Sequence, residues 1–192
     1  MYLIRSLFSV SLMILLGRLT GFARELLISN LAGATRKTDL AVILFNMPDM
    51  LINIILGGGL AITIIPIIQK LNKKNQIIFS TQILLIIGLI FSVVSIIILL
   101  IPQPLLSLLA PGLDFNFHEE VQGPLNLILI SVPLTGLAGV TAAILNSKQK
   151  FRLGSSGTLI FNLSIISFLL LKVPLLWGIS LGVLAGSILR LL

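Results

Sequence analysis

Cysteine is absent from this sequence of 192 residues, and only 10% of its residues are charged. The first absence excludes disulfides and thiol chemistry. The second excludes an ordinary soluble domain, where about 25% of residues are charged, because too few polar groups remain to cover a core. Histidine occurs once, as His118, and the sequence contains no metal-ligand cluster, nucleophile–base pair or phosphate-binding loop. We therefore expect no metal, no cofactor and no enzyme activity.

Hydrophobic residues make up 57% of the chain, and the mean hydropathy is +1.16. The longest apolar run, residues 77–101, carries no charge. At about 1.5 Å per residue, a helix of this length spans a hydrocarbon core of about 30 Å with some tilt. The sequence therefore predicts an all-α, polytopic membrane protein.

We predict one transmembrane domain over residues 1–192, a bundle of about six helices. The spans are expected at about 6–32, 39–70, 77–101, 125–147, 154–172 and 174–192. Polar or proline-containing breaks separate them, at 33–39, 70–75, 102–124, 147–153 and near 172–174. The first apolar run continues without a small-residue cleavage motif, which favours a span over a signal peptide.

The Lys and Arg residues indicate an orientation. If the N-terminus is inside, the inner loops hold Arg5, Lys70, Lys73, Lys74, Lys148, Lys150 and Arg152, and the outer side holds Arg36, Lys37 and Lys172. Because positive residues gather in cytoplasmic loops, this seven-to-three distribution predicts a cytoplasmic N-terminus. The net charge of +7 has the same explanation, and we expect no nucleic-acid partner.

Three charges interrupt the first span. Arg18 and Glu25 are seven residues apart and therefore share a helix face, whereas Arg24 is rotated by about 120° from Arg18. A charge in the hydrocarbon costs about 2.5–3.5 kcal/mol on insertion scales, so each one needs a partner or a function. Snorkelling to the interface is an alternative for Arg24 and Glu25, but it is a poor explanation for Arg18 near the middle.

The second span contains helix-breaking and polar residues. Asp39 opens it, and Pro48 and Asp49 lie inside it, before the glycine run of residues 57–59. Irregular, polar helices are tolerated at membrane depth beside a water-filled cavity or within protein. We expect the two aspartates to pair with Arg24 and Arg18. These charges then either line a polar groove or form salt bridges that only fix helix packing.

The remaining spans are less polar. Span 77–101 has no ionisable residue and is interpreted as a lipid-facing or a scaffold helix. Small residues in the last three spans predict close helix packing; they include Gly136, Gly139, Gly154, Gly157, Asn162, Gly178, Gly182 and Gly186.

An ordered set of motifs runs through the first two spans: GRLTGFARE from Gly17, GATRKTD from Gly33, MPDM from Met47, LGGG from Leu56 and IIP ending at Pro66. It resembles the N-terminus of the MurJ (MviN) lipid II flippases. The matching positions are Arg18, Gly21, Phe22, Ala23, Arg24, Glu25, Gly33, Ala34, Thr38, Asp39, Pro48, Gly58 and Pro66. LAPG at 109–112 and AILNSKQKF at 143–151 resemble later landmarks.

This resemblance implies one lobe of a multidrug/oligosaccharidyl-lipid/polysaccharide-type exporter in the bacterial inner membrane. The family moves an undecaprenyl-pyrophosphate-linked peptidoglycan precursor, lipid II, from the inner to the outer leaflet. By resemblance, the substrate-binding residues are Arg18, Arg24 and Asp39, and Glu25 and Asp49 complete the candidate site. Arginine suits this role because its planar fork pairs with phosphate oxygens.

The sequence departs from the family at two charged positions and in length. Ile52 replaces the family's arginine, and Gly57 replaces its glutamate. The resemblance covers an N-terminal lobe alone, so we expect the partner lobe, if present, on another chain. The leading hypothesis is part of a lipid II flippase, from a truncated form or a gene fragment. The alternative is a truncated or degenerate membrane protein that keeps the fold without transport.

Overall fold

The computed structural model describes residues 2–56, 59–109 and 119–192, and every regular element within them is a helix. The helices are α1 (Tyr2–Ala32), α2 (Arg36–Leu56), α3 (Leu60–Lys70), α4 (Lys73–Leu100), α5 (Pro102–Leu109), α6 (Glu119–Ser147), α7 (Phe151–Ser155), α8 (Gly157–Leu169) and α9 (Leu175–Leu189). The predicted all-α class is therefore confirmed.

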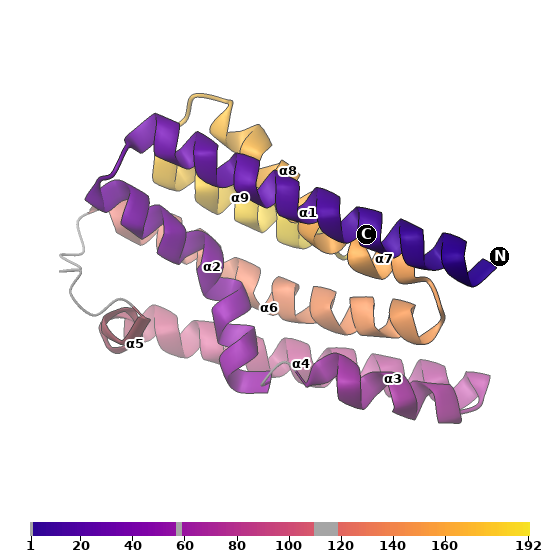
Figure 1. The fold of residues 1–192 in the computed structure, drawn as a ribbon. Coiled ribbons are helices and arrows are strands. Elements are labelled where there is room, and N and C mark those ends of the chain that lie inside the picture. The colour runs from indigo at the N-terminus through magenta and orange to yellow at the C-terminus, as the bar shows by residue number, and fades with distance from the viewer. Residues whose placement is uncertain (1, 57–58, 110–118) are drawn as a thin grey trace.

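The long helices lie side by side along one direction (Figure 1), with successive passes running in opposite senses. Three of them are long and apolar enough to cross a bilayer, Arg36–Ile55, Lys73–Leu100 and Val121–Ser147. Helices α8 and α9 have only 13 and 15 residues, about 20 Å each, which is shorter than a hydrocarbon core of about 30 Å. The chain is a membrane helix bundle, and its number of crossings stays a prediction.

Two predicted segments can be compared with the helices. Residues 39–70, expected as one span interrupted by helix-breaking residues, contain most of α2 and all of α3, and the crossing itself stays a prediction. The expected loop 102–124 contains all of α5 and the first turn of α6. Gly57, Gly58 and His118, on which we made predictions, lie outside the described residues.

Specific residues end these helices. Gly33 adopts a left-handed φ of 63° directly after α1, the conformation that glycine supplies at helix C-termini. Between α3 and α4, the side chain of Asn72 accepts a hydrogen bond from Asn75 N at 2.9 Å and caps α4. Gln76 Nε2 donates to the carbonyls of Ile68 and Leu71, both at 3.0 Å. These hydrogen bonds connect the end of α3 with the start of α4.

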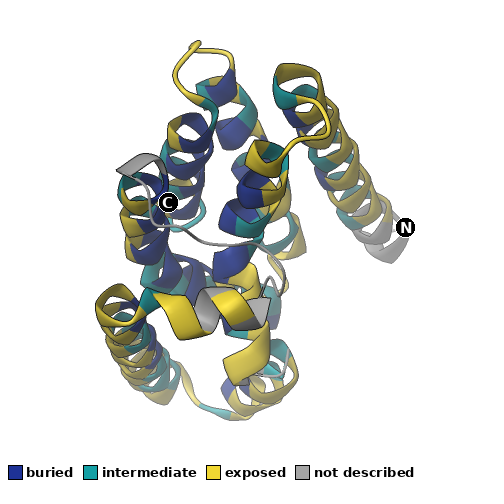
Figure 2. Ribbon diagram, turned by 90° about the vertical axis from the view of Figure 1, so that its left-hand side faces the viewer, coloured by how far each residue is buried: buried dark blue, intermediate teal, exposed yellow. Residues whose placement is uncertain are grey.

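Helix α6 is the centre of the bundle. It packs against α2, α3, α4 and α9, and half of its most apolar stretch is buried, compared with 22% for α4. Buried residues concentrate on the central helices, whereas α1, next to the N label in Figure 2, is exposed along much of its length. Helix α1 joins the bundle mainly through α8.

The predicted close packing at small residues is confirmed. A Cβ on Gly182 of α9 would lie 2.6 Å from Ile165 Cα on α8, and one on Gly136 of α6 would lie 2.7 Å from the Phe91 ring on α4. Hydroxyl groups add contacts between helices, such as Thr135 Oγ1 and Ser187 Oγ, which lie 2.9 Å apart between α6 and α9. In the same bundle, α8 packs against α1, and α9 packs against α2.

Candidate functional site

Arg24 lies inside the bundle rather than at its surface. Only 7% of the residue is exposed, and its guanidinium carbon lies 3.7 Å from the centroid of the Phe45 ring on α2. Its Nη1 donates to Asn162 Oδ1 on α8 at 2.7 Å, and its Nη2 contacts Glu25 Oε1 at 3.3 Å. The snorkelling alternative is therefore wrong for Arg24. Helices α1, α2 and α8 meet at this side chain.

Asn162 holds α8 to α1 at two points. While its Oδ1 accepts from Arg24, its Nδ2 donates to the carbonyl of Gly17 at 2.9 Å. The approach requires a small residue at position 21, since a Cβ on Gly21 would lie 3.2 Å from Asn162 Nδ2. With Ile28, these α1 residues form one helical stripe facing the bundle, and Arg24 belongs to that stripe.

The other two charges of α1 point elsewhere. Arg18 and Glu25 are both exposed, in agreement with a shared helix face, whereas Arg24 is buried. Arg18 makes no ion pair or side-chain hydrogen bond with any residue in the described part of the chain. Asp39, exposed near the start of α2, likewise has no ion pair among the described residues.

The predicted partner of Asp49 was wrong. Its Oδ1 lies 3.6 Å from Nη1 of Arg190, directly after α9, and not beside Arg18. Arg190 also donates its Nε–H to the carbonyl of Gly157 at 3.1 Å, and its guanidinium lies 3.8 Å from the centroid of the Phe161 ring. The interaction therefore connects α2 with α8 and α9.

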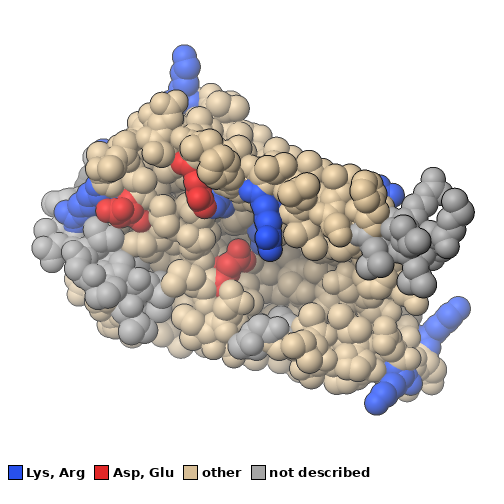
Figure 3. All heavy atoms as spheres, in the orientation of Figure 1, with Lys and Arg blue, Asp and Glu red and all other residues tan. Residues whose placement is uncertain are grey.

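Charged side chains gather at a hollow on one face of the molecule. Figure 3 shows acidic and basic side chains near the middle of this face, where it is hollowed between α1 above and α2 and α3 below. The guanidinium groups of Arg24 and Arg190 both contact α8, Arg24 through Asn162 and Arg190 through the Gly157 carbonyl and the Phe161 ring. We call these two arginines, their carboxylate partners Glu25 and Asp49, and the exposed Arg18 of α1 the groove cluster.

The groove cluster is suited to an anionic group. It contains three cations and two carboxylates, and both buried guanidinium groups are stacked on phenylalanine rings. Arg24 Nε is buried and has no hydrogen-bond partner among the described residues. A planar guanidinium with a donor left over is a ready ligand for phosphate oxygens.

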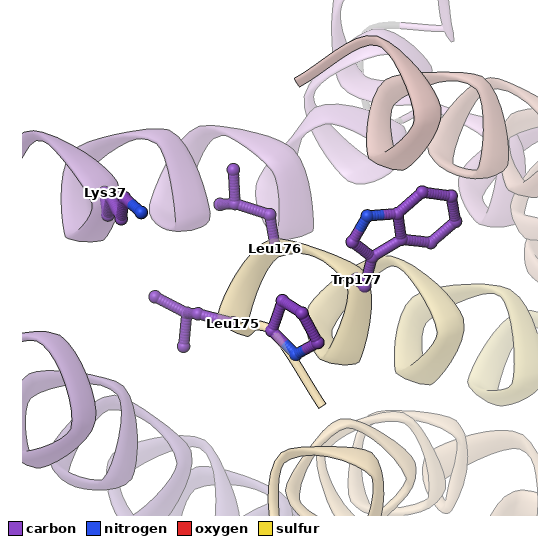
Figure 4. A pocket seen from close by; sticks show the side chains of 5 residues that line it. Lys37, Leu175, Leu176 and Trp177 are labelled. Carbon is purple, nitrogen blue, oxygen red and sulfur yellow. The ribbon is translucent and has the colours of Figure 1, made fainter. Parts of the chain in front are cut away.

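Two further pockets lie away from the groove cluster. One, of about 220 Å³, is lined by Lys37, Pro174, Leu175, Leu176 and Trp177; in Figure 4 the two leucines stand between Lys37 and Trp177. The other, of about 360 Å³, lies between α4 and α6 and is mostly apolar. Lysine with tryptophan is typical of the membrane–water interface, and neither pocket brings two cations together.

Sequence reasoning missed Asn162 and Arg190. Asn162 was interpreted as a small packing residue and Arg190 received no role in the site, yet both contact the predicted charges. A signal existed for Asn162, because it is an amide within an otherwise apolar run, and polar side chains at membrane depth usually have partners or functions. Arg190 had no such signal, since an arginine after an apolar helix resembles a topology anchor.

Comparison with known proteins agrees with this arrangement. The family model described as lipid II flippase MurJ matches residues 28–192. A probable lipid II flippase MurJ from Buchnera aphidicola (subsp. Acyrthosiphon pisum) is 32% identical over 175 residues, which is 88% of this chain and 34% of the relative.

The chain belongs to the lipid II flippase MurJ family.

More distant relatives extend the match over nearly the whole chain. The probable flippase of Aquifex aeolicus is 29% identical over 97% of the chain and 39% of its own length. The lipid II flippase MurJ of Burkholderia cenocepacia is 27% identical over 100% and 39%. The chain thus spans between 34% and 39% of the length of these MurJ relatives.

Proposed function

We propose that this chain forms part of a flippase that moves a pyrophosphate-linked lipid, lipid II, from the inner to the outer leaflet of the bacterial inner membrane. The relatives are named for lipid II flipping, which is transport rather than catalysis. The observation that carries the proposal is the buried Arg24, whose Nε has no hydrogen-bond partner among the described residues.

In this proposal, the groove cluster receives the anionic head group while the lipid tail stays in the membrane. Arg24 binds phosphate oxygens, held in position by Asn162 and Phe45. Arg18, exposed on the same helix, adds positive charge at the entrance, and Glu25 limits the affinity so that the lipid can be released. Asp39 is kept as a further head-group contact near the end of α1.

The proposal retains the predicted orientation, with a cytoplasmic N-terminus. Alternating access uses two helix bundles that move about one site. A second bundle, expected above on another chain, is therefore kept as the partner for transport.

Binding of undecaprenyl pyrophosphate by the chain in lipid nanodiscs tests the head-group site. We expect Arg24→Gln to weaken binding at least tenfold, the loss of one charge-assisted hydrogen bond, and Arg24→Lys to retain part of it. Arg152→Gln, at an exposed position of α7, is the control and should bind normally. Equal binding by Arg24→Gln and the unaltered chain would favour the alternative, a membrane protein that keeps the fold without the function.

A further inference from the structure

Like Arg24, Arg190 is largely buried, and its guanidinium group is held by several contacts. Its side chain is only 12% exposed, its Nε is fixed by the Gly157 carbonyl, and its plane is stacked on Phe161. These contacts use the Nε–H and one face of the guanidinium group. Its Nη1 atom is directed toward Asp49.

The contact between Arg190 and Asp49 is long for a charged pair. At 3.6 Å, it exceeds the 2.7–2.9 Å that is typical of an N⁺–H···O⁻ hydrogen bond. The side chain of Asp49 is also 50% exposed, so the protein does not enclose its carboxylate. An anion with better geometry and more charge can therefore replace this carboxylate without disturbing the anchoring of Arg190.

Arg24 and Arg190 have similar surroundings. Each guanidinium group lies over a phenylalanine ring, each donates a hydrogen bond to α8, and each contacts one carboxylate, Glu25 for Arg24 and Asp49 for Arg190. A pyrophosphate offers two phosphate groups, so it can engage two guanidinium forks at once.

We propose that Arg190 is a second head-group ligand, which pairs with the second phosphate of a pyrophosphate lipid, and that Asp49 is the internal counter-ion displaced on binding. This inference rests on the proposed function and deepens it. Asp49 then acts as a competitor for Arg190 and sets the affinity. A purely structural ion pair between α2 and α9 would instead stabilise the fold without distinguishing between lipids.

The test compares undecaprenyl pyrophosphate with undecaprenyl monophosphate, each titrated into the full chain in nanodiscs. We expect Arg190→Gln to weaken binding of the pyrophosphate lipid about tenfold and that of the monophosphate lipid much less. Asp49→Asn should strengthen binding of the pyrophosphate lipid severalfold, an effect that misfolding cannot produce. In the double variant Arg190→Gln/Asp49→Asn, the gain in affinity from Asp49→Asn should be smaller, because the arginine that it frees is no longer present.

Three results would overturn the inference: Arg190→Gln binds the pyrophosphate lipid normally, it weakens both lipids equally, or Asp49→Asn weakens binding. Arg190→Lys keeps the positive charge, so it should retain part of the preference for the pyrophosphate lipid over the monophosphate lipid. This variant therefore distinguishes a lost lipid contact from misfolding. If Arg24→Gln loses binding while Arg190→Gln does not, only this inference fails. If the unaltered chain binds neither lipid, the proposed function fails with it.

Discussion

The two sides of the bundle differ in the side chains that they carry, aliphatic on α4 and partly charged on α1. On the α4 side, the helix surface is almost entirely aliphatic, with Leu85 and Leu89 each 68% exposed, and its buried polar contact is Ser95 Oγ with the Leu129 carbonyl. On the α1 side, a helix of similar length carries three charges within eight residues. Length therefore does not explain the difference, and for the buried Arg24 its partners do.

Each buried charge on the α1 side is surrounded by groups that replace water. Arg24 has an aromatic face, an amide and a carboxylate, and Arg190 has an aromatic face, a carbonyl and a carboxylate. Helix α4 offers nothing of this kind on its exposed face. The comparison teaches that a guanidinium group is tolerated here because of its surroundings. Substitutions on the two sides test this difference.

The largest effect is expected when a charge is moved to the side without partners. Leu89→Arg should lower the free energy of unfolding by about 3 kcal/mol, because the guanidinium would face lipid alone. Thermal unfolding in nanodiscs measures this, with Leu89→Met as the neutral control. If Leu89→Arg is as stable as Leu89→Met, the contrast between the two sides is wrong.

Removing the amide beside Arg24 should have the next largest effect. Asn162→Leu deletes the hydrogen bonds to Arg24 and to the Gly17 carbonyl and should cost about 2 kcal/mol. Asn162→Asp keeps an acceptor for Arg24 but loses the donor to Gly17, so its unfolding midpoint should be intermediate. If both variants unfold at the midpoint of the unaltered chain, neither hydrogen bond stabilises the bundle.

On the α4 side, an added methyl group should destabilise the bundle at Gly136 but not at Gly88. Gly136→Ala would place its Cβ 2.7 Å from the fully buried Phe91 ring and should destabilise by about 1–3 kcal/mol. Gly88→Ala meets Leu137 at an ordinary 3.4 Å and should be neutral or stabilise by up to about 1 kcal/mol. Equal unfolding midpoints would contradict this packing.

Ser95→Ala should have the smallest effect. It removes the hydrogen bond of 2.8 Å to the Leu129 carbonyl, and hydroxyl contacts between membrane helices contribute about 0.6 kcal/mol on average. The same unfolding assay should show a shift of that size. A loss comparable to that of Asn162→Leu would mean that α4 depends on polar contacts as much as α1 does.

The sequence predicted well what depends on local pattern. The run 77–101 appears as α4, because an uncharged apolar stretch of that length has few alternatives, and the glycines of α9 pack closely as expected. The shared face of Arg18 and Glu25 follows from helical periodicity alone.

The sequence did not predict contacts between distant helices. The pairing of Asp49 with Arg190 and of Arg24 with Asn162 joins residues 141 and 138 positions apart, and no periodicity encodes which helices become neighbours. Both helices within residues 39–70, α2 and α3, pack against α6, a contact that the sequence pattern did not indicate. The helix in residues 102–109 was missed because its two prolines resembled a loop signal.

The central claim is that the face between α1 and α2 is a hydrated groove, in contrast to the lipid-facing side of α4. Because the chain has no cysteine, single cysteine variants can be labelled without background by a water-soluble maleimide in membranes. The account predicts that Arg18→Cys and Asp49→Cys react rapidly and Leu89→Cys hardly at all. Labelling of Arg18→Cys and Asp49→Cys no faster than that of Leu89→Cys would contradict it.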